Sequence, residues 1–306
     1  MTRVEISRAR EVQLLTYRYI LHFPLSSPAT AIMTLTVSLV TSPSDFTSIA
    51  PMEHDAWLTP YNPQLKHCRP QLPTREEAIA WKIAHDTKRL AANDPDLFMI
   101  KVYNLLPSYH HSLTVMKATN EKNEIVGWAT WEVCNPATSD GKGVEATWHP
   151  EGSEERAFAE VFWDGMVEFM TSRVTRKHLG THLPVPSLRL SSSHSPDLAS
   201  MTVSPAHRHL GAGRALLQWG KDKADELGIE TVVSSLPSAR GAYEKCGFGC
   251  IEVLPTNPEL WVEKEGRGQK WKELLEEDLS GWLMWRPVGR DWREGDQAPW
   301  MESKEV

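Results

Sequence analysis

The chain has 306 residues and a mass of 34.6 kDa, which leaves room for one large domain or two modest ones. Its composition, 41% hydrophobic and 24% charged, is typical of a soluble globular protein. The net charge of −7 and the pI near 6.0 argue against a general nucleic-acid binder, and no apolar stretch approaches the length of a membrane span.

Residues 1–32 differ in character from the rest of the chain. Three arginines precede an apolar run over residues 12–23, and Arg18 interrupts that run. The internal arginine argues against a secretory signal, whereas the arginine-rich composition leaves a mitochondrial transit peptide open. We expect a disordered leader, or a segment upstream of a native start at Met33.

The first predicted elements are a strand and two helices. Residues 34–40 alternate apolar and polar side chains, which predicts a strand. A helix with a serine cap is predicted over residues 45–57. After a proline-rich loop, the capping box Thr74-Arg-Glu-Glu77 predicts a helix that continues to about Ala92.

A β-hairpin is predicted next, from strands over residues 111–118 and 125–133 that a polar turn joins. Trp128 and Trp131 stand three positions apart on the second strand and therefore face opposite sides of the sheet. One is expected in the core, and the other is a candidate for the lining of a substrate cleft.

A long helix and a long connection follow. Ser153 caps a predicted amphipathic helix from Glu154 to about Lys177. Residues 178–197 then carry three prolines and a run of three serines. A connection of this length is uncommon, so we expect an insertion that is either a lid or disordered.

The central stretch is a strand, a glycine turn and a helix. Residues 197–203 predict a strand that Ser204-Pro205 ends, and the helix after the turn closes at Gly228. The turn over residues 206–214 contains two arginines, two histidines and no acid. Free N–H groups before a helix, on a locally positive segment, predict a site for a phosphorylated ligand.

The spacing of the turn separates three kinds of phosphate loop. A P-loop needs Gly-Lys-Ser/Thr, which Gly213-Arg-Ala lacks. A dinucleotide fingerprint needs Gly or Ala where Leu216 stands and an acid after the next strand, which residues 232–236 do not offer. What remains is Arg208-x-x-Gly211-x-Gly213. It resembles the acetyl-CoA loop of the GNAT superfamily of N-acetyltransferases, although an ordinary glycine turn would explain this motif taken alone.

A second segment strengthens the resemblance. The strand over residues 230–235 leads into Leu236–Phe248, where Tyr243-Glu-Lys-Cys-Gly-Phe248 is similar to the strand-5 and helix-4 segment of GNAT proteins. The resemblance covers residues 197–250 and is strongest to fungal-type GNAT proteins, which share Leu-Leu-Gln-Trp-Gly, here residues 216–220. Beyond it we predict a strand over 250–254, a short helix over 271–275, a last strand over 281–286 and a flexible tail over 291–306.

The resemblance implies an α/β GNAT fold over residues 33–290. Its mixed central sheet, with flanking helices, would be splayed between strand 4 (197–203) and strand 5 (230–235). The implied activity is direct transfer of an acetyl group from acetyl-CoA to an amine acceptor, either a small molecule or a peptide. Two alternatives stay open: a non-catalytic acyl-CoA-binding or regulatory module, and a different nucleotide-binding fold.

The same resemblance assigns the cofactor site. The backbone of Met201, Thr202 and Val203 would pair with the pantetheine arm, and one N–H group would polarise the thioester carbonyl. The diphosphate would lie on the turn and the first helical turn, mainly on N–H groups, although the two arginines could equally be solvated charges. These residues are Arg208, His209, Leu210, Gly211, Ala212, Gly213 and Arg214.

Tyr243 is the catalytic candidate, because the matching tyrosine of GNAT proteins acts as general acid beside the CoA sulfur. Proton transfer from a phenol to a thiolate is uphill by roughly 2 kcal/mol in water, so hydrogen bonding to the thiolate is the safer role. A core tyrosine is the plain alternative. The general base is not identifiable, and Glu132 and His194 are its candidates.

The four cysteines show no metal-binding spacing, so we expect reduced thiols in a cytoplasmic protein and no metal site. The expected partner is the amine acceptor, with no nucleic acid and no membrane, and self-association as a homodimer is left open.

Overall fold

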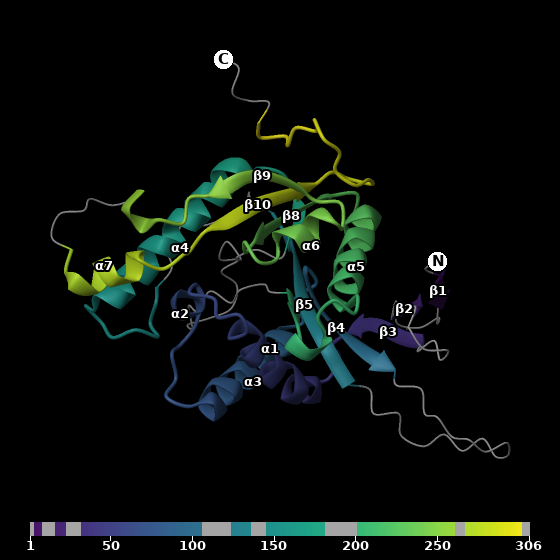
Figure 1. The fold of residues 1–306 in the computed structure, drawn as a ribbon, viewed down its shortest axis with the longest axis horizontal. Coiled ribbons are helices and arrows are strands. Elements are labelled where there is room, and N and C mark those ends of the chain that lie inside the picture. Colours follow the sequence, from purple (N-terminus) through teal and green to yellow (C-terminus); the bar gives the residue numbers. More distant parts are fainter. Residues whose placement is uncertain are drawn as a thin grey trace, which may run out of the picture.

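A mixed ten-stranded sheet with helices on both faces forms the molecule (Figure 1). The computed structural model describes residues 3–7, 16–22, 32–105, 124–135, 145–180, 201–260 and 267–301. Neighbouring strands follow the order β1-β2-β3-β4-β5-β6-β8-β10-β9, and β7 pairs with β5 beside this path. The strands are β1 (Arg3–Ser7), β2 (Thr16–His22), β3 (Ile32–Leu39), β4 (Leu97–Leu105), β5 (Glu124–Cys134), β6 (His178–Gly180), β7 (Met201–Val203), β8 (Glu230–Ser235), β9 (Gly249–Leu254) and β10 (Gly281–Arg286).

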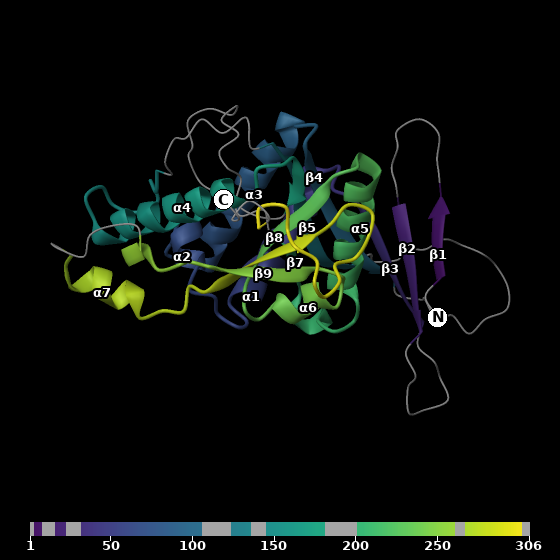
Figure 2. The same ribbon diagram turned by 90° about the horizontal axis from the view of Figure 1, so that it is seen from above.

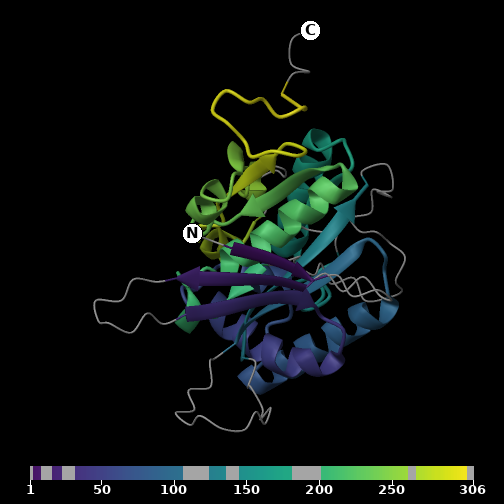
Figure 3. The same cartoon turned by 90° about the vertical axis from the view of Figure 1, so that its right-hand side faces the viewer.

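The helices divide between the two faces of the sheet (Figures 1 and 3). Val232 on β8 packs in the cluster that includes α4, and the next residue, Val233, packs in the cluster that includes α5. Because successive strand residues face opposite sides, α4 and α5 cover opposite faces. The helices are α1 (Phe46–Trp57), α2 (Leu65–Cys68), α3 (Arg75–Ala92), α4 (Glu154–Arg173), α5 (Ala212–Leu227), α6 (Arg240–Glu244) and α7 (Gln269–Leu275), with 3-10 turns η1 (Pro43–Asp45), η3 (Pro205–His207) and η4 (Pro258–Leu260).

Several predicted helix ends are confirmed. Thr74 and Glu77 form the reciprocal capping box of α3, with the Thr74 hydroxyl accepting from the Glu77 N–H. Ser153 caps α4 through the N–H of Arg156 at 3.1 Å. Gly228 ends α5 with φ of 67°, a conformation that costs glycine little. These caps depend on local chemistry alone, which is why the sequence predicts them well.

The sheet splays where the prediction places the opening. Both β6 and β7 pair antiparallel with β5, at residues 132–134 and 127–129 respectively, so they follow one another along the same edge. β6 is also paired in parallel with β8, whereas β7 has β5 as its only strand partner in the described sheet. The predicted strand 4, here β7, therefore has no pairing with the predicted strand 5, here β8, and it is β6 that joins β5 to β8.

The predicted insertion is partly wrong, because its first residues belong to the sheet. His178–Gly180 form β6, and all three residues are buried between β5 and β8. Backbone pairing on both sides holds this short segment in the sheet, which its composition does not reveal. Residues 181–200, including the first part of the predicted strand over 197–203, lie outside the described residues.

The strand partner of β5 also differs from the prediction. The predicted partner, residues 111–118, lies outside the described residues, and the strand that pairs with β5 is β4, which sequence analysis missed. β4 lies between β3 and β5 and pairs with both. Its nearly continuous apolar run, Leu97-Phe-Met-Ile, fits a central strand that is buried on both faces.

Trp128 and Trp131 face opposite sides of β5, as predicted. Trp128 packs on Phe46 of α1, and Trp131 lies against Gly220 of α5, where an added Cβ would stand 2.2 Å from the indole ring. Both side chains are fully buried, so the expectation that one of them lines a substrate cleft is wrong. The glycine on α5 is what lets the helix approach the sheet closely enough to cover the ring.

The segment predicted as a disordered leader contains two strands. β1 pairs with β2, and β2 pairs with β3, all antiparallel. Figure 2 shows this hairpin at the opposite end of the molecule from α7. The run Thr16-Tyr-Arg-Tyr-Ile is rich in aromatic and β-branched residues, which favours a strand and explains why its arginine does not prevent order.

The tail after residue 290 is packed on the domain as far as Met301, which contradicts the prediction of a flexible tail for the described part. The Trp292 N–H donates to the Gly247 carbonyl at 2.9 Å, and Trp300 is buried edge-on to Trp285. The indole N–H of Trp300 donates to Glu252 on β9 at 3.2 Å. Large aromatic side chains near a terminus are the signal that would have indicated this packing.

Replacing Trp300 with alanine should therefore destabilise the whole domain. A buried tryptophan truncated to alanine costs about 3 kcal/mol, and we expect that loss in the free energy of unfolding measured with urea. Met301→Ala is the control, since the neighbouring Met301 is 42% exposed and should change stability little. Equal stability of the Trp300→Ala variant and the wild type would show that the tail does not pack in solution.

His67 on α2 is buried between aromatic rings. Its ring lies 4.9 Å from Phe158 and 5.7 Å from Phe162, and neither ring nitrogen has a hydrogen-bond partner among the described residues. Burial, followed by the nearby charges of Lys66 and His149, lowers the pKa of His67 from 6.5 to about 3. The folded protein therefore holds this imidazole neutral well below neutral pH.

This burial should make the fold acid-sensitive. Below pH 6.5 the unfolded chain binds a proton at His67 that the folded chain does not, so stability falls by about 1.4 kcal/mol per pH unit until the folded-state pKa near 3 is reached. When the pH falls from about 7.5 to about 4.5, the free energy of unfolding of the His67→Phe variant should therefore fall by about 3 kcal/mol less than that of the wild type. Phe162→Leu, a packing change in the same cluster without a titrating group, should lower stability equally at both pH values. An unchanged pH profile in His67→Phe would contradict the assignment.

Candidate active site

The N-terminus of α5 is open toward solvent and carries no acid. Gly211 precedes the helix with φ of 88°, and no side chain in the described part of the chain caps its first turn. The N–H groups of the first helical turn have no intrahelical partner, so those of Ala212, Gly213 and Arg214 are available to an anion. The first turn contains no acid, and the exposed Arg214 adds a positive charge there.

The turn before α5 holds a second residue in the left-handed region, His209, with φ of 66°. Gly211 in this region, followed by the right-handed helical Ala212, is the kind of alternation that turns neighbouring N–H groups to one side, as in anion-binding nests. Leu210, between His209 and Gly211, is half-buried. The predicted phosphate segment is therefore one continuous turn that ends on the helix.

The Arg208 side chain points elsewhere. Its guanidinium donates to the carbonyl of Ala56 at 3.0 Å and to that of Thr59, which follows α1. These carbonyls belong to the C-terminal end of α1, where a cation stabilises the helix dipole. Arg208 thus joins α1 to the turn before α5, and any contact of this residue with a phosphate would be made by its N–H group.

β7 is held close to β5 by the small size of Gly127. A Cβ at this position would lie 2.9 Å from the Thr202 carbonyl oxygen and 3.1 Å from Val102. Met201 and Val203 are partly buried against the α5-side cluster, while Thr202 is buried on the other face. Sequence analysis missed Gly127, although a glycine inside a strand signals such a close backbone approach.

Tyr243 lies on α6 and faces the same cluster as β7 and α5. Its ring meets Phe248 edge-on at 5.6 Å, and its side chain is 6% exposed. The cluster also contains Ala212 at the start of α5 and Val233 on β8. The structure therefore brings Tyr243, the open end of α5 and the splayed strands onto one side of the sheet.

Two residues from other elements fix the end of α6. Lys221 of α5 donates to the Cys246 carbonyl at 2.9 Å and pairs with Asp291 of the tail at 2.6 Å. Asp291 lies directly against Gly247, where a Cβ would be 2.2 Å from its carboxyl carbon. Burial raises the pKa of the Cys246 thiol, against the opposing charges of Lys221 and Arg214, so this cysteine stays protonated.

The two candidates for the general base stay predictions. Glu132 is half-buried on β5, opposite Gly180 of β6, and His194 lies outside the described residues. Among the described residues, no group of three or more His, Cys, Asp or Glu side chains could hold a metal ion. The same residues include no helix long and apolar enough to cross a membrane.

A family model, described as the acetyltransferase (GNAT) family, matches residues 80–248. The chain belongs to the GNAT acetyltransferase family. The match begins within α3 and ends just after α6, so it includes the splayed strands, the turn at Gly211 and Tyr243. Members of this family generally use acetyl-CoA, and the N-terminus of α5, which has no side-chain cap, lies within the matched residues of this GNAT protein.

Two solved structures are similar to this GNAT protein at low identity. The ribosomal-protein-S18-alanine N-acetyltransferase from Escherichia coli is 12% identical, with a TM-score of 0.34, and the alignment covers 86% of this chain and 99% of that one. The protein smu.2055 from Streptococcus mutans UA159 is 13% identical, with a TM-score of 0.37 and coverage of 81% and 96%. A comparison with curated proteins finds no match.

Proposed function

We propose that this GNAT protein transfers an acetyl group from acetyl-CoA directly to an amine. The proposal rests on the course of the chain beside the opening in the sheet. β7 does not pair with β8, and the chain continues from β7 through the turn at Gly211 into the N-terminus of α5, which has no side-chain cap. A thioester arm would lie along β7 while its diphosphate rests on the helix. Family membership supports this proposal.

In this proposal the amine attacks the thioester carbonyl carbon, so that the C–N bond forms before the C–S bond breaks. An N–H group of Met201, Thr202 or Val203 stabilises the oxygen that becomes negative. The electron pair of the C–S bond leaves on sulfur, where the Tyr243 hydroxyl donates a hydrogen bond or a proton. The attacking nitrogen loses its proton to water or to a base in the acceptor site.

The alternative is an acyl-CoA-binding module without transfer activity, and one observation favours it. Tyr243 is buried among apolar side chains, as a tyrosine that serves only packing would be. A module of this kind would bind CoA with the same turn and helix but would lack a productive acceptor site. The cytoplasmic location expected from the cysteines and the open question of a homodimer stay predictions.

The decisive experiment is incubation of the full chain with acetyl-CoA labelled in its acetyl group and with pools of small amines and peptides. We expect mass spectrometry to detect a labelled amide above the level found without protein. Binding of CoA measured by calorimetry without any labelled product would support the module. The absence of CoA binding would contradict both functions.

A further inference from the structure

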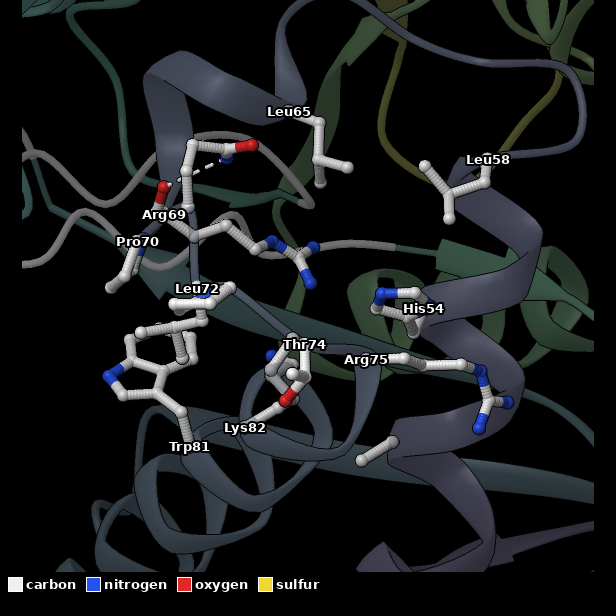
Figure 4. A pocket seen from close by; sticks show the side chains of 14 residues that line it. His54, Leu58, Leu65, Arg69, Pro70, Leu72, Thr74, Arg75, Trp81 and Lys82 are labelled. Carbon is white, nitrogen blue, oxygen red and sulfur yellow. Dashed lines mark hydrogen bonds between the residues drawn. The ribbon is translucent and has the colours of Figure 1, made fainter.

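A cavity of about 190 Å³ lies between α1 and α3, where the segment of residues 69–74 connects α2 to α3. Its wall combines apolar and cationic side chains (Figure 4). No aspartate or glutamate lines it within the described part of the chain. The apolar part includes Leu58, Leu65, Leu72 and Trp81, and the cationic part is Arg69, Arg75 and Lys82, with His54.

Two of the three cations have carboxylate partners that hold them in place. Arg75 binds both oxygens of Asp55, at 2.7 and 3.0 Å. Lys82 is almost fully buried and contacts Asp86 at 3.1 Å, with Glu53 at 3.7 Å. These pairs are structural connections within and between α1 and α3, so neither side chain needs a ligand.

Arg69 is different, because most of its donors are unused. One N–H group binds Glu53 at 3.0 Å, and the guanidinium lies 5.6 Å from the centre of the Trp57 ring. A guanidinium carries five N–H donors, and the other donors of Arg69 have no hydrogen-bond partner among the described residues. The side chain is only 15% exposed, so bulk water covers little of it. No Arg69 nitrogen is among the buried polar atoms without a partner in the described part of the chain, so its remaining donors are open to the cavity and available to an anion.

The orientation of Arg69 shows where those donors point. Figure 4 shows the guanidinium directed into the middle of the cavity, with His54 of α1 approaching from the opposite wall and Leu58 and Leu65 above. His54 makes one hydrogen bond, from its Nδ1 to Asp55 at 3.3 Å. A planar fork of donors and an imidazole therefore converge on one point, beside an apolar wall.

We propose that this cavity binds the carboxylate of a small apolar acid, with Arg69 as the bidentate anchor. Arginine matches the two oxygens of a carboxylate with parallel N–H donors, which gives both affinity and geometry. The apolar wall suits a short branched chain, and a cavity of about 190 Å³ has room for a molecule of this size. Inorganic phosphate shares the charge but is fully polar, so the leucines favour the organic acid over it.

The test is calorimetry of the full chain with 3-methylbutanoate, its uncharged amide and inorganic phosphate, in the absence of acetyl-CoA. We expect the carboxylate to bind at least about 10-fold more tightly than the amide or phosphate. Equal binding of acid and amide, tighter binding of phosphate, or no heat with the acid would each overturn the proposal. Because the measurement involves no acyl transfer, its failure would leave the proposed acetyltransferase activity untouched.

Three variants locate the site. Arg69→Lys keeps the charge beside Glu53 but loses the fork, and should weaken binding of the acid about 10-fold. Ala78→Leu fills the cavity from α3 without touching a charge, and should abolish binding. Lys88→Arg is the control, since this exposed lysine of α3 does not line the cavity, and its affinity should stay within about two-fold. Unchanged binding in Ala78→Leu would overturn the assignment even if Arg69→Lys does not fold.

Discussion

Gly211→Asp is expected to lower the affinity for acetyl-CoA by about 10²-fold or more while the domain stays folded. The substitution would place a carboxylate at the N-terminus of α5, where the proposed site holds a diphosphate, so repulsion replaces charge-assisted hydrogen bonds. It also adds a side chain at φ of 88°, which costs about 1 kcal/mol of stability. Calorimetry with acetyl-CoA measures the affinity, and urea unfolding measures the stability.

Gly228→Asp is the matched control at the other end of α5. Gly228 has φ of 67°, and a Cβ there would meet nothing within 4 Å, so this variant carries similar strain and the same charge. It should lose more free energy of unfolding than Gly211→Asp, because a carboxylate at a helix C-terminus opposes the helix dipole, and it should keep its affinity for acetyl-CoA. If both variants bind acetyl-CoA like the wild type, the diphosphate does not lie at this helix end.

Elements with complete local signals are the ones that the sequence predicts correctly. β8 is a short segment with β-branched residues at its centre, β10 is a short apolar run, and α3 and α5 carry recognisable caps at one end. β4 escapes prediction because a continuous apolar run after a helix has no periodicity of its own. β6 has only three residues, and it is a strand because of its two neighbours rather than its composition.

The candidate site shows the same contrast between local features, which the sequence predicts, and tertiary contacts, which it does not. The spacing of Arg208 and Gly211 predicts a turn before a helix, and the structure has that turn. The sequence leaves the Arg208 side chain open between a phosphate contact and a solvated charge, because it cannot show that the end of α1 lies beside the turn. In the structure this side chain binds the carbonyls of Ala56 and Thr59. A partner about 150 positions earlier in the chain is a tertiary contact that no motif encodes.

The packed tail also changes how Tyr243 is held. The sequence places Tyr243 on a short helix, and the structure adds Lys221 and Asp291, which fix the loop directly after it. α6 has only five residues and no side-chain cap, so its position depends on these contacts more than on helix propensity. Substitutions at Tyr243 itself can therefore keep the surrounding backbone unchanged.

Tyr243→Phe is expected to slow acetyl transfer by about 10²-fold and to leave the dissociation constant of acetyl-CoA within a few-fold of the wild-type value. The hydroxyl is proposed to act on a sulfur that becomes anionic only as the C–S bond breaks, so ground-state binding should scarcely use it. Phenylalanine keeps the ring and its edge-on contact with Phe248 while removing the donor. Single-turnover kinetics would measure the chemical step, and calorimetry the affinity.

The thiol leaving group provides a second test of the same variant. When the thioester has a more acidic thiol, the leaving thiolate needs less stabilisation. The ratio of the wild-type rate to the rate of the Tyr243→Phe variant should therefore be smaller with such a thioester. A packing role would lower both rates by the same factor, whatever the thiol. Phe248→Leu, which disturbs the neighbouring ring and keeps the hydroxyl, is the control and should show no dependence on the leaving group. Equal rates of the Tyr243→Phe variant and the wild type, where chemistry limits turnover, would reduce Tyr243 to a residue of the core.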